Sequence, residues 1–248
     1  MDFKQYREMC LEHTAKGLRA SVTPDVLIIQ SITTIEELDE IINRLTTRVR
    51  EWYAWSNPEF CHFMRNQDKS VELIATKPKE VLLKEVGMQE SVGGNLSEED
   101  SAVISNFALH VQNIIELRDH HKTHLENILK KHCPNVHIIL GTTLTARIIR
   151  HTGSLRKLAM TPAPVIQIMG AEKALFKHLS QKSRSPKYGF LFAHPLIAQV
   201  ARKHHGKMAR AIADKTALAA KADFFTQSPL GANLRKDLEK KVAMLVSQ

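Results

Sequence analysis

The sequence predicts an all-α protein in which a long antiparallel helical hairpin, a coiled coil, precedes a compact helical domain. Apolar residues recur at helical spacing through two long segments of the first half. The second half combines short segments bounded by Gly or Pro with one alanine-rich segment, and alanine is the strongest helix former. Charge divides the chain at nearly the same place, so we expect two domains, residues 1–134 and 135–248.

The first long helix is expected to begin directly after Thr23. Thr23 can cap the start, Pro24 suits the first helical position, and Asp25 lies where the helix dipole favours an anion. From there apolar residues follow one another in steps of three or four, close to the coiled-coil repeat, and Pro58 marks the expected end. The apolar positions are Ile28, Ile32, Ile35, Leu38, Ile42, Leu45, Val49 and Trp52.

The second long helix is expected to begin at Ser97, which stands before an acidic run in a pattern like a capping box, and to end near Pro134. At about 35 residues each and 1.5 Å per residue, both helices would be roughly 50 Å long. We expect them to pair antiparallel, with short helices and a mobile loop at the far tip, in residues 61–96. The apolar seam exceeds what one partner helix can cover, which predicts a homodimer through residues 24–132. The expected dimer contacts are Ile35, Ile42, Leu45, Val49, Phe107, Val111 and Ile114.

Basic residues are concentrated in the second half. Residues 1–131 hold 16 Lys and Arg against 21 Asp and Glu, whereas residues 132–248 hold 19 against 5, a net charge of +14. A domain with this charge most often binds a polyanion, usually nucleic acid. The alternative is a solvated basic surface without such a partner.

Several protein classes are excluded. The sequence has no apolar run long enough for a membrane span and no secretory signal, so we expect a soluble protein inside the cell. Three cysteines without a CxxC spacing argue against a disulfide framework and against a cysteine zinc site. Nucleotide-binding and serine-hydrolase motifs are absent, and the basic half has no obvious close pair of carboxylates. The sequence therefore predicts a protein that is not an enzyme and that uses neither cofactor nor metal.

Six segments, in order along nearly the whole chain, are similar to one known family: Ser21–Gln30, Arg50–Tyr53, Gly170–Lys177, Pro186–Gly189, His194–Ile197 and Gly206–Ala213. The last four resemble the Nop domain, and the long run Gly170–Lys177 is specific to it. The first two resemble the coiled coil that precedes the Nop domain in archaeal members.

The resemblance implies a scaffold of the box C/D guide-RNA particle, which directs 2′-O-methylation of RNA. In that family the coiled coil drives self-association, and the Nop domain grips a kink-turn RNA already occupied by a small kink-turn-binding protein of the ribosomal type. A separate N-terminal domain holds the methyltransferase fibrillarin. Because this chain begins shortly before the coiled coil, that domain is expected to be missing, and fibrillarin is a doubtful partner. The implied location is the cytoplasm of an archaeon or, alternatively, the nucleus or nucleolus.

Residues near Gly170 favour the same RNA clamp. Gly170 and Ala171 read as a turn before a helix start, where unpaired backbone N–H groups attract phosphate. Lys173 and Lys177 stand four residues apart, hence on one helical face, and could meet phosphates together. Glu172 cannot favour phosphate. We expect it either to cap the helix or to contact the partner protein together with Gly170 and Ala171.

A second group of expected RNA contacts lies further along the chain. His194 precedes Pro195, which disfavours helical geometry at the histidine and places it in a loop before a helix. An imidazole there can stack on an unpaired base, and the resemblance assigns His194 to base contact. The densest cationic stretch is expected to contact phosphates and consists of Arg202, Lys203, Lys207 and Arg210. The alternatives are a solvated helix face for the cations and a structural hydrogen bond for the histidine.

Three other functions stay open. The chain could be a protein-only adaptor whose coiled coil dimerises while the basic half meets an acidic partner. It could belong to the spliceosomal branch of the Nop family, which binds a kink-turn complex in a different particle. The weakest alternative is a metal-dependent RNA-processing enzyme that uses His120, His121 and His124, of which two stand one helical turn apart but outside any HExxH pattern.

Overall fold

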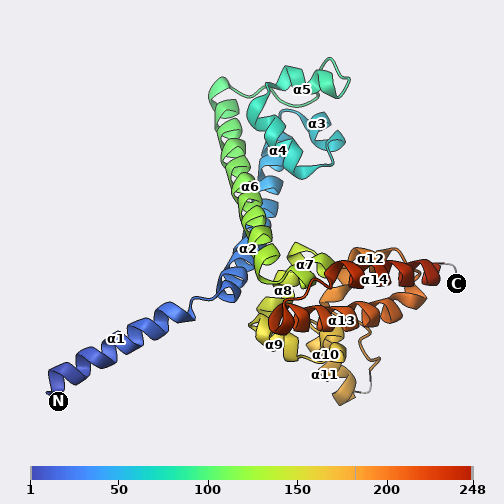
Figure 1. Cartoon of the computed structure of the whole chain (residues 1–248). Coiled ribbons are helices and arrows are strands. Elements are labelled where there is room, and N and C mark those ends of the chain that lie inside the picture. The colour runs from blue at the N-terminus through green and yellow to red at the C-terminus, as the bar shows by residue number, and fades with distance from the viewer. Residues whose placement is uncertain (1, 182, 247–248) are drawn as a thin grey trace. The chain divides into compact units, whose positions relative to one another are not determined.

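The computed structural model describes residues 2–181 and 183–246, and every regular element in that part of the chain is a helix (Figure 1). This confirms the all-α prediction. The chain forms two compact units. One unit consists of Thr33–Thr123, and the other combines residues from the start of the chain to Ile32 with residues from His124 onward. The first helix, α1 (Phe3–Ser21), has no buried residue.

The first unit contains most of the expected hairpin. The two long helices are α2 (Pro24–Tyr53) and α6 (Glu98–His132), close to the predicted bounds. Between them lie α3 (Pro58–Phe63), α4 (Gln67–Thr76) and α5 (Lys79–Glu85), so the expectation of short helices at the tip is confirmed. Within this unit α2 and α6 run antiparallel, because Arg118 of α6 reaches Asp39 of α2 whereas the far ends of both helices share one core.

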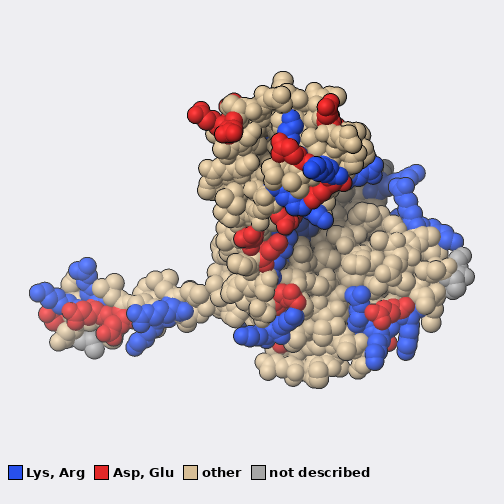
Figure 2. Space-filling view, turned by 90° about the horizontal axis from the view of Figure 1, so that it is seen from above, with Lys and Arg blue, Asp and Glu red and all other residues tan. Residues whose placement is uncertain are grey.

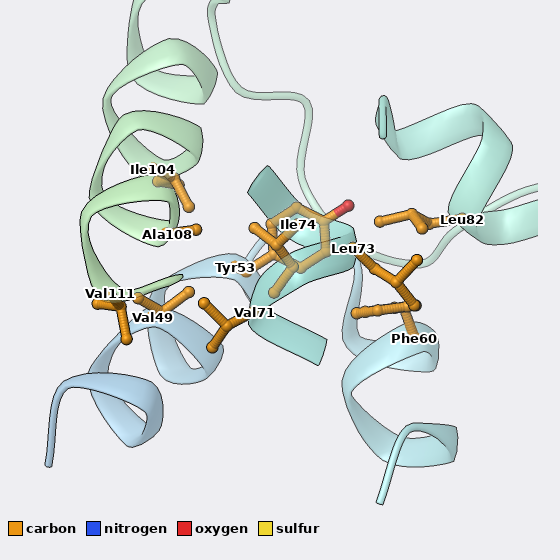
Figure 3. Close-up of a cluster of buried hydrophobic side chains, with 10 residues drawn as sticks. All are labelled: Val49, Tyr53, Phe60, Val71, Leu73, Ile74, Leu82, Ile104, Ala108 and Val111. Carbon is orange, nitrogen blue, oxygen red and sulfur yellow. The ribbon is translucent and has the colours of Figure 1, made fainter. Parts of the chain in front are cut away.

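That core unites all five helices of the first unit (Figure 3). Ten buried side chains form it: Val49, Tyr53, Phe60, Val71, Leu73, Ile74, Leu82, Ile104, Ala108 and Val111. In the same unit Arg118, with only 12% of its side chain exposed, pairs with Asp68 at 3.1 Å and with Asp119 at 2.9 Å. Burial by itself would lower the pKa of Arg118, but Asp119 and Asp68 outweigh it and raise that pKa.

The predicted dimer contacts need a correction. Ile35, Ile42, Val49 and Val111 are at most 3% exposed, because they pack inside the hairpin of a single chain. A side chain buried there cannot contact a second copy, so the prediction is wrong for these four residues. Leu45 and Phe107 are only partly buried against the core, and Ile114 is half-buried, so their role stays a prediction.

The second unit is a bundle of shorter helices around α13 (His205–Lys221). Helix α13 packs against α7 (Pro134–Leu140), α9 (Leu155–Met160), α10 (Ala163–Ile168) and α14 (Gly231–Val246). Its buried alanines, Ala209, Ala213, Ala217, Ala219 and Ala220, permit this close approach on several sides and confirm the predicted central element. The remaining elements are α8 (Thr142–Thr152), α11 (Glu172–Gln181), α12 (Pro195–Ala198) and the short helices η1 (Phe190–Ala193), η2 (Arg202–His204) and η3 (Ala222–Thr226).

Two polar contacts, one partly buried and one buried, fix the helix starts of this unit. The Oδ1 atom of Asp25, at the start of α2, lies 2.8 Å from Nε2 of His132 and accepts the N–H of Leu155 at 3.1 Å. It therefore joins the beginning of α2 to the end of α6 and the beginning of α9.

Within the described residues, no helix combines the length and the apolar composition that a membrane-spanning segment needs.

Asp223 and Asn135 form the second contact. One oxygen of Asp223 accepts from the backbone N–H of Asn135 at 3.0 Å and from its Nδ2 at 2.7 Å, and the other accepts from the N–H of Val136 at 2.9 Å. Burial raises the pKa of Asp223, and these hydrogen bonds partly offset that rise. Both oxygens face only donors, so this position needs a group that accepts and does not donate.

Replacing Asp223 by Asn is expected to destabilise the second unit. The amide nitrogen of the new side chain would face one of the N–H donors, which leaves buried donors opposed and costs about 1 to 3 kcal/mol. Chemical denaturation followed by circular dichroism measures the loss. Asp214→Asn, an exposed change on α13, is the matched control and should have little effect. Equal stability of the two variants would show that the Asp223 contacts do not hold the fold.

Candidate nucleic-acid interface

The predicted phosphate contacts are all on the surface of the second unit. Lys173 and Lys177 lie on α11, Arg202 and Lys203 on η2, and Lys207 and Arg210 on the first turns of α13, and all six side chains are exposed. On the face drawn in Figure 2, Lys and Arg stand in separate groups, some of them beside Asp or Glu. Because the six candidate cations are spread over three helices, they suit a ligand with repeated charges better than one compact anion.

The turn before α11 has the predicted form. Gly170 has a φ of +83°, and a Cβ there would come within 2.7 Å of the Phe190 ring, so the position requires glycine for two reasons. Helix α11 begins at Glu172, and no residue of this helix is buried. Lys173 and Lys177 project from it one turn apart, as the sequence predicts.

Glu172 serves its own chain. Its Oε1 accepts the N–H of Gly170 at 2.7 Å and lies 2.8 Å from Nε2 of His151 on α8. Burial by itself would raise the pKa of Glu172, but backbone hydrogen bonds and His151 outweigh it, so that pKa lies below its ordinary value. The side chain of Glu172 is thus bound to the turn before α11 and to α8 of the same chain. Capping of α11 by Glu172, and contact of Gly170, Ala171 and Glu172 with a partner protein, stay predictions.

His194 needs a correction. It is 1% exposed, its Nε2 lies 2.8 Å from the carbonyl oxygen of Ile139, and its Nδ1 accepts the N–H of Leu196 at 3.1 Å. These contacts fix a neutral ring, and burial lowers its pKa. The predicted base contact is wrong, because the imidazole has no face on the surface. The prediction of a loop before a helix is confirmed, since α12 begins at Pro195.

His204, between the cations, is an unusual residue. It is 7% exposed, and neither ring nitrogen has a hydrogen-bond partner in the described part of the chain. Burial, followed by Lys203 and Lys207, lowers its pKa, so the ring is neutral near pH 7. It thus adds no charge to the cationic stretch.

The described His, Cys, Asp and Glu residues include no group of three placed to hold a metal ion.

An aromatic cluster next to these cations was not predicted from the sequence. The rings of Tyr188 and Phe192 stack with their centroids 4.9 Å apart, and His205 lies 6.0 Å from each. The signal in the sequence was the spacing of two aromatic residues four apart between Pro186 and the basic run. Nothing in that spacing tells that His205 joins them, because this contact depends on how η1 and α13 pack.

The family model described as "Nop: snoRNA binding domain, fibrillarin" matches residues 34–244. Nucleolar protein 58 of Homo sapiens is 34% identical over 266 residues, which cover 98% of this chain and 50% of that protein. An uncharacterized NOP5 family protein of Methanocaldococcus jannaschii is 36% identical over 216 residues, 81% of this chain and 52% of that protein. The chain thus spans about half the length of these relatives.

Among solved structures, a fibrillarin/Nop5p complex is similar in fold. Its matching chain aligns with a TM-score of 0.58 over 98% of this chain and 78% of its own length, at 23% identity. The printed name of that structure joins Nop5p to fibrillarin. Because the matching family model is also described with fibrillarin, the expectation that fibrillarin is a doubtful partner is not borne out. The match to the family model covers most of both compact units. Relatives above 30% identity align with most of this chain. Together with the match to the family model, they show that this chain belongs to the Nop family.

Proposed function

We propose that this chain is an RNA-binding scaffold of a box C/D guide ribonucleoprotein. It recognises a kink-turn RNA together with its bound kink-turn protein and supports guided 2′-O-methylation without catalysing it. The observation that carries the proposal is the set of six exposed cations on α11, η2 and α13, in a half of the chain with a net charge of +14. Family membership supports the choice of RNA as the polyanion.

Five of these six cations are available to an outside ligand. Within the described residues, Lys173, Lys177, Arg202, Lys207 and Arg210 make no ion pair with a carboxylate of the chain. These ammonium and guanidinium groups can therefore bind phosphates of an RNA without first breaking an ion pair within the chain. The name of the nucleolar relative supports the nucleolus as the location, and the cytoplasm of an archaeon is the alternative.

Helix α11 supports the composite part of the proposal. Phe176 and Leu179 are each 68% exposed, beside Lys173 and Lys177 on the same short helix. Apolar side chains do not bind phosphate, but they are typical of protein contacts. One helix thus offers cations to RNA and apolar groups to a protein. We propose that the kink-turn protein covers the apolar side and that fibrillarin belongs to the same particle.

The self-association of the coiled coil is proposed with different residues from those that the sequence indicated. Ile41 on α2 and Leu117 on α6 are 44% and 47% exposed. They stand at the same level of the hairpin, because Arg118 reaches Asp39 there. Large apolar side chains exposed on both helices suit contact with a second copy.

RNA affinity is expected to fall steeply with salt. Replacing Arg202 and Lys207 by Ala should weaken binding of a kink-turn RNA with its kink-turn protein. It should also flatten the slope of log affinity against log salt by about 0.7 to 0.9 per lost contact. Filter binding over a salt series measures both. Lys236→Ala, an exposed change on α14, is the control. An unchanged slope in the double variant would place the RNA site elsewhere.

Combining Ile41→Asp with Leu117→Asp is expected to convert a dimer into a monomer, because burying two carboxylates at an interface is costly. Sedimentation velocity at micromolar concentration measures the change, and circular dichroism checks that helicity is kept. Asn43→Asp, an exposed change on α2, should leave the dimer intact. A monomeric wild-type chain would contradict the proposed assembly.

A further inference from the structure

We propose that Tyr188, Phe192 and His205 form a stacking platform for an unpaired RNA base, an inference that rests on the proposed RNA-binding function. This aromatic platform lies on the second unit, where the segment before η1, η1 itself and the first residue of α13 meet.

The rings already form the beginning of a stack. Tyr188 and Phe192 are parallel to within 11°, with their centroids 4.9 Å apart, which is stacking geometry. Phe192 is 55% exposed although one of its faces is covered by Tyr188. The exposed area therefore belongs to the opposite face and the edge. A base placed on that face would extend the stack by one ring.

The platform is held in place before any ligand arrives. Nε2 of Gln167 donates to the carbonyl of Lys187 at 2.8 Å, and the N–H of Gly189 donates to the carbonyl of Gln167 at 3.1 Å. A Cβ on Gly189 would collide with the backbone of Met169, so only glycine permits this approach. Nε2 of His205 lies 3.1 Å from the carbonyl oxygen of Val200. A fixed surface loses little freedom on binding, which favours affinity.

The charge around the platform selects a polyanion. Residues 183–211 contain six Lys and Arg and no Asp or Glu. Lys187 precedes Tyr188, and its side-chain carbons lie 3.6 Å from the position of a Cβ on Gly206, directly after His205. Arg202 and Lys207 stand on either side of His205 along the chain. A nucleotide offers both complements at once, because its base has a π face and its phosphate a negative charge.

A single-stranded segment fits better than a paired one. Bases in an A-form helix have their faces covered by their neighbours, whereas an unpaired base can leave the stack and rest on an aromatic ring. The occupant is therefore a nucleotide next to the paired stems of the RNA. A protein side chain in the same place is the outcome that the experiment must separate from it.

The test compares wild-type protein with Phe192→Leu, which keeps an apolar side chain and removes the ring. The probe is a kink-turn RNA with a single-stranded extension, carrying 2-aminopurine or an abasic nucleotide at each unpaired position in turn. We expect Phe192→Leu to weaken binding by roughly 5- to 150-fold and to abolish quenching of one 2-aminopurine. The abasic RNA should weaken wild-type binding by a similar factor and leave the variant unaffected.

Two further variants keep the test sharp. Phe192→Tyr retains a ring and should bind as the wild type does. Phe225→Leu removes a ring that is 61% exposed in η3, at the other end of α13, and should have no effect. The platform is overturned if wild type binds RNA with the expected salt dependence while Phe192→Leu binds equally well, and the proposed function then survives.

Two other outcomes would also overturn the aromatic platform. A loss that appears only with the kink-turn protein, and that the abasic RNA does not reproduce, would overturn the platform and indicate a protein contact. If wild type binds no RNA under any condition, both the platform and the proposed function fail.

Discussion

The packing of the second unit depends on Asn135, a buried amide whose hydrogen bonds are all made within the chain. Its Nδ2 donates to Asp223 at 2.7 Å and to the carbonyl of Ser228 at 2.9 Å. Its Oδ1 accepts the N–H groups of Leu230 and Gly231 at the start of α14. One side chain at the start of α7 thus fixes η3 and α14, and a full set of partners makes this arrangement more specific than apolar packing alone. Gly231 has no room for a Cβ, which would lie 2.9 Å from the Cα of Asn135.

Helix α7, which begins next to Asn135, also positions residues of the candidate interface. Helix α7 contains both Asn135 and Ile139. The carbonyl oxygen of Ile139 lies 2.8 Å from Nε2 of His194 and 3.1 Å from a guanidinium nitrogen of Arg235. His194 is therefore a positioning residue. It holds the segment after η1 against the core, and η1 contains Phe192. A histidine that touches no ligand can in this way decide where an exposed aromatic ring lies.

The sequence predicted helices better than it predicted partners. Pro24, Ser97 and Pro134 marked the start of α2 and both ends of α6 closely, because capping and proline effects act within one turn. Pro58 did not mark the end of α2, which lies at Tyr53, more than one turn earlier. The spacing of Ile35, Ile42 and Val49 showed that they face another helix, but periodicity does not say whether that helix belongs to the same chain. The rule for residues before proline placed His194 in a loop. It could not show that the ring points inward, since that depends on Ile139, far away in sequence.

Four contacts also join the cationic helix α11 to the aromatic segment. Glu172 accepts from Gly170 and lies beside His151, the His151 ring lies 5.5 Å from that of Phe190, and Gly170 packs on Phe190. Each of these four residues contacts two of the others. The start of α11 therefore cannot shift without moving the segment that contains Tyr188 and Phe192. Beyond Glu172 the helix buries no side chain. The interface therefore has a fixed part, which can orient a base, and a projecting part, whose lysines and apolar side chains can adapt to the remaining partners.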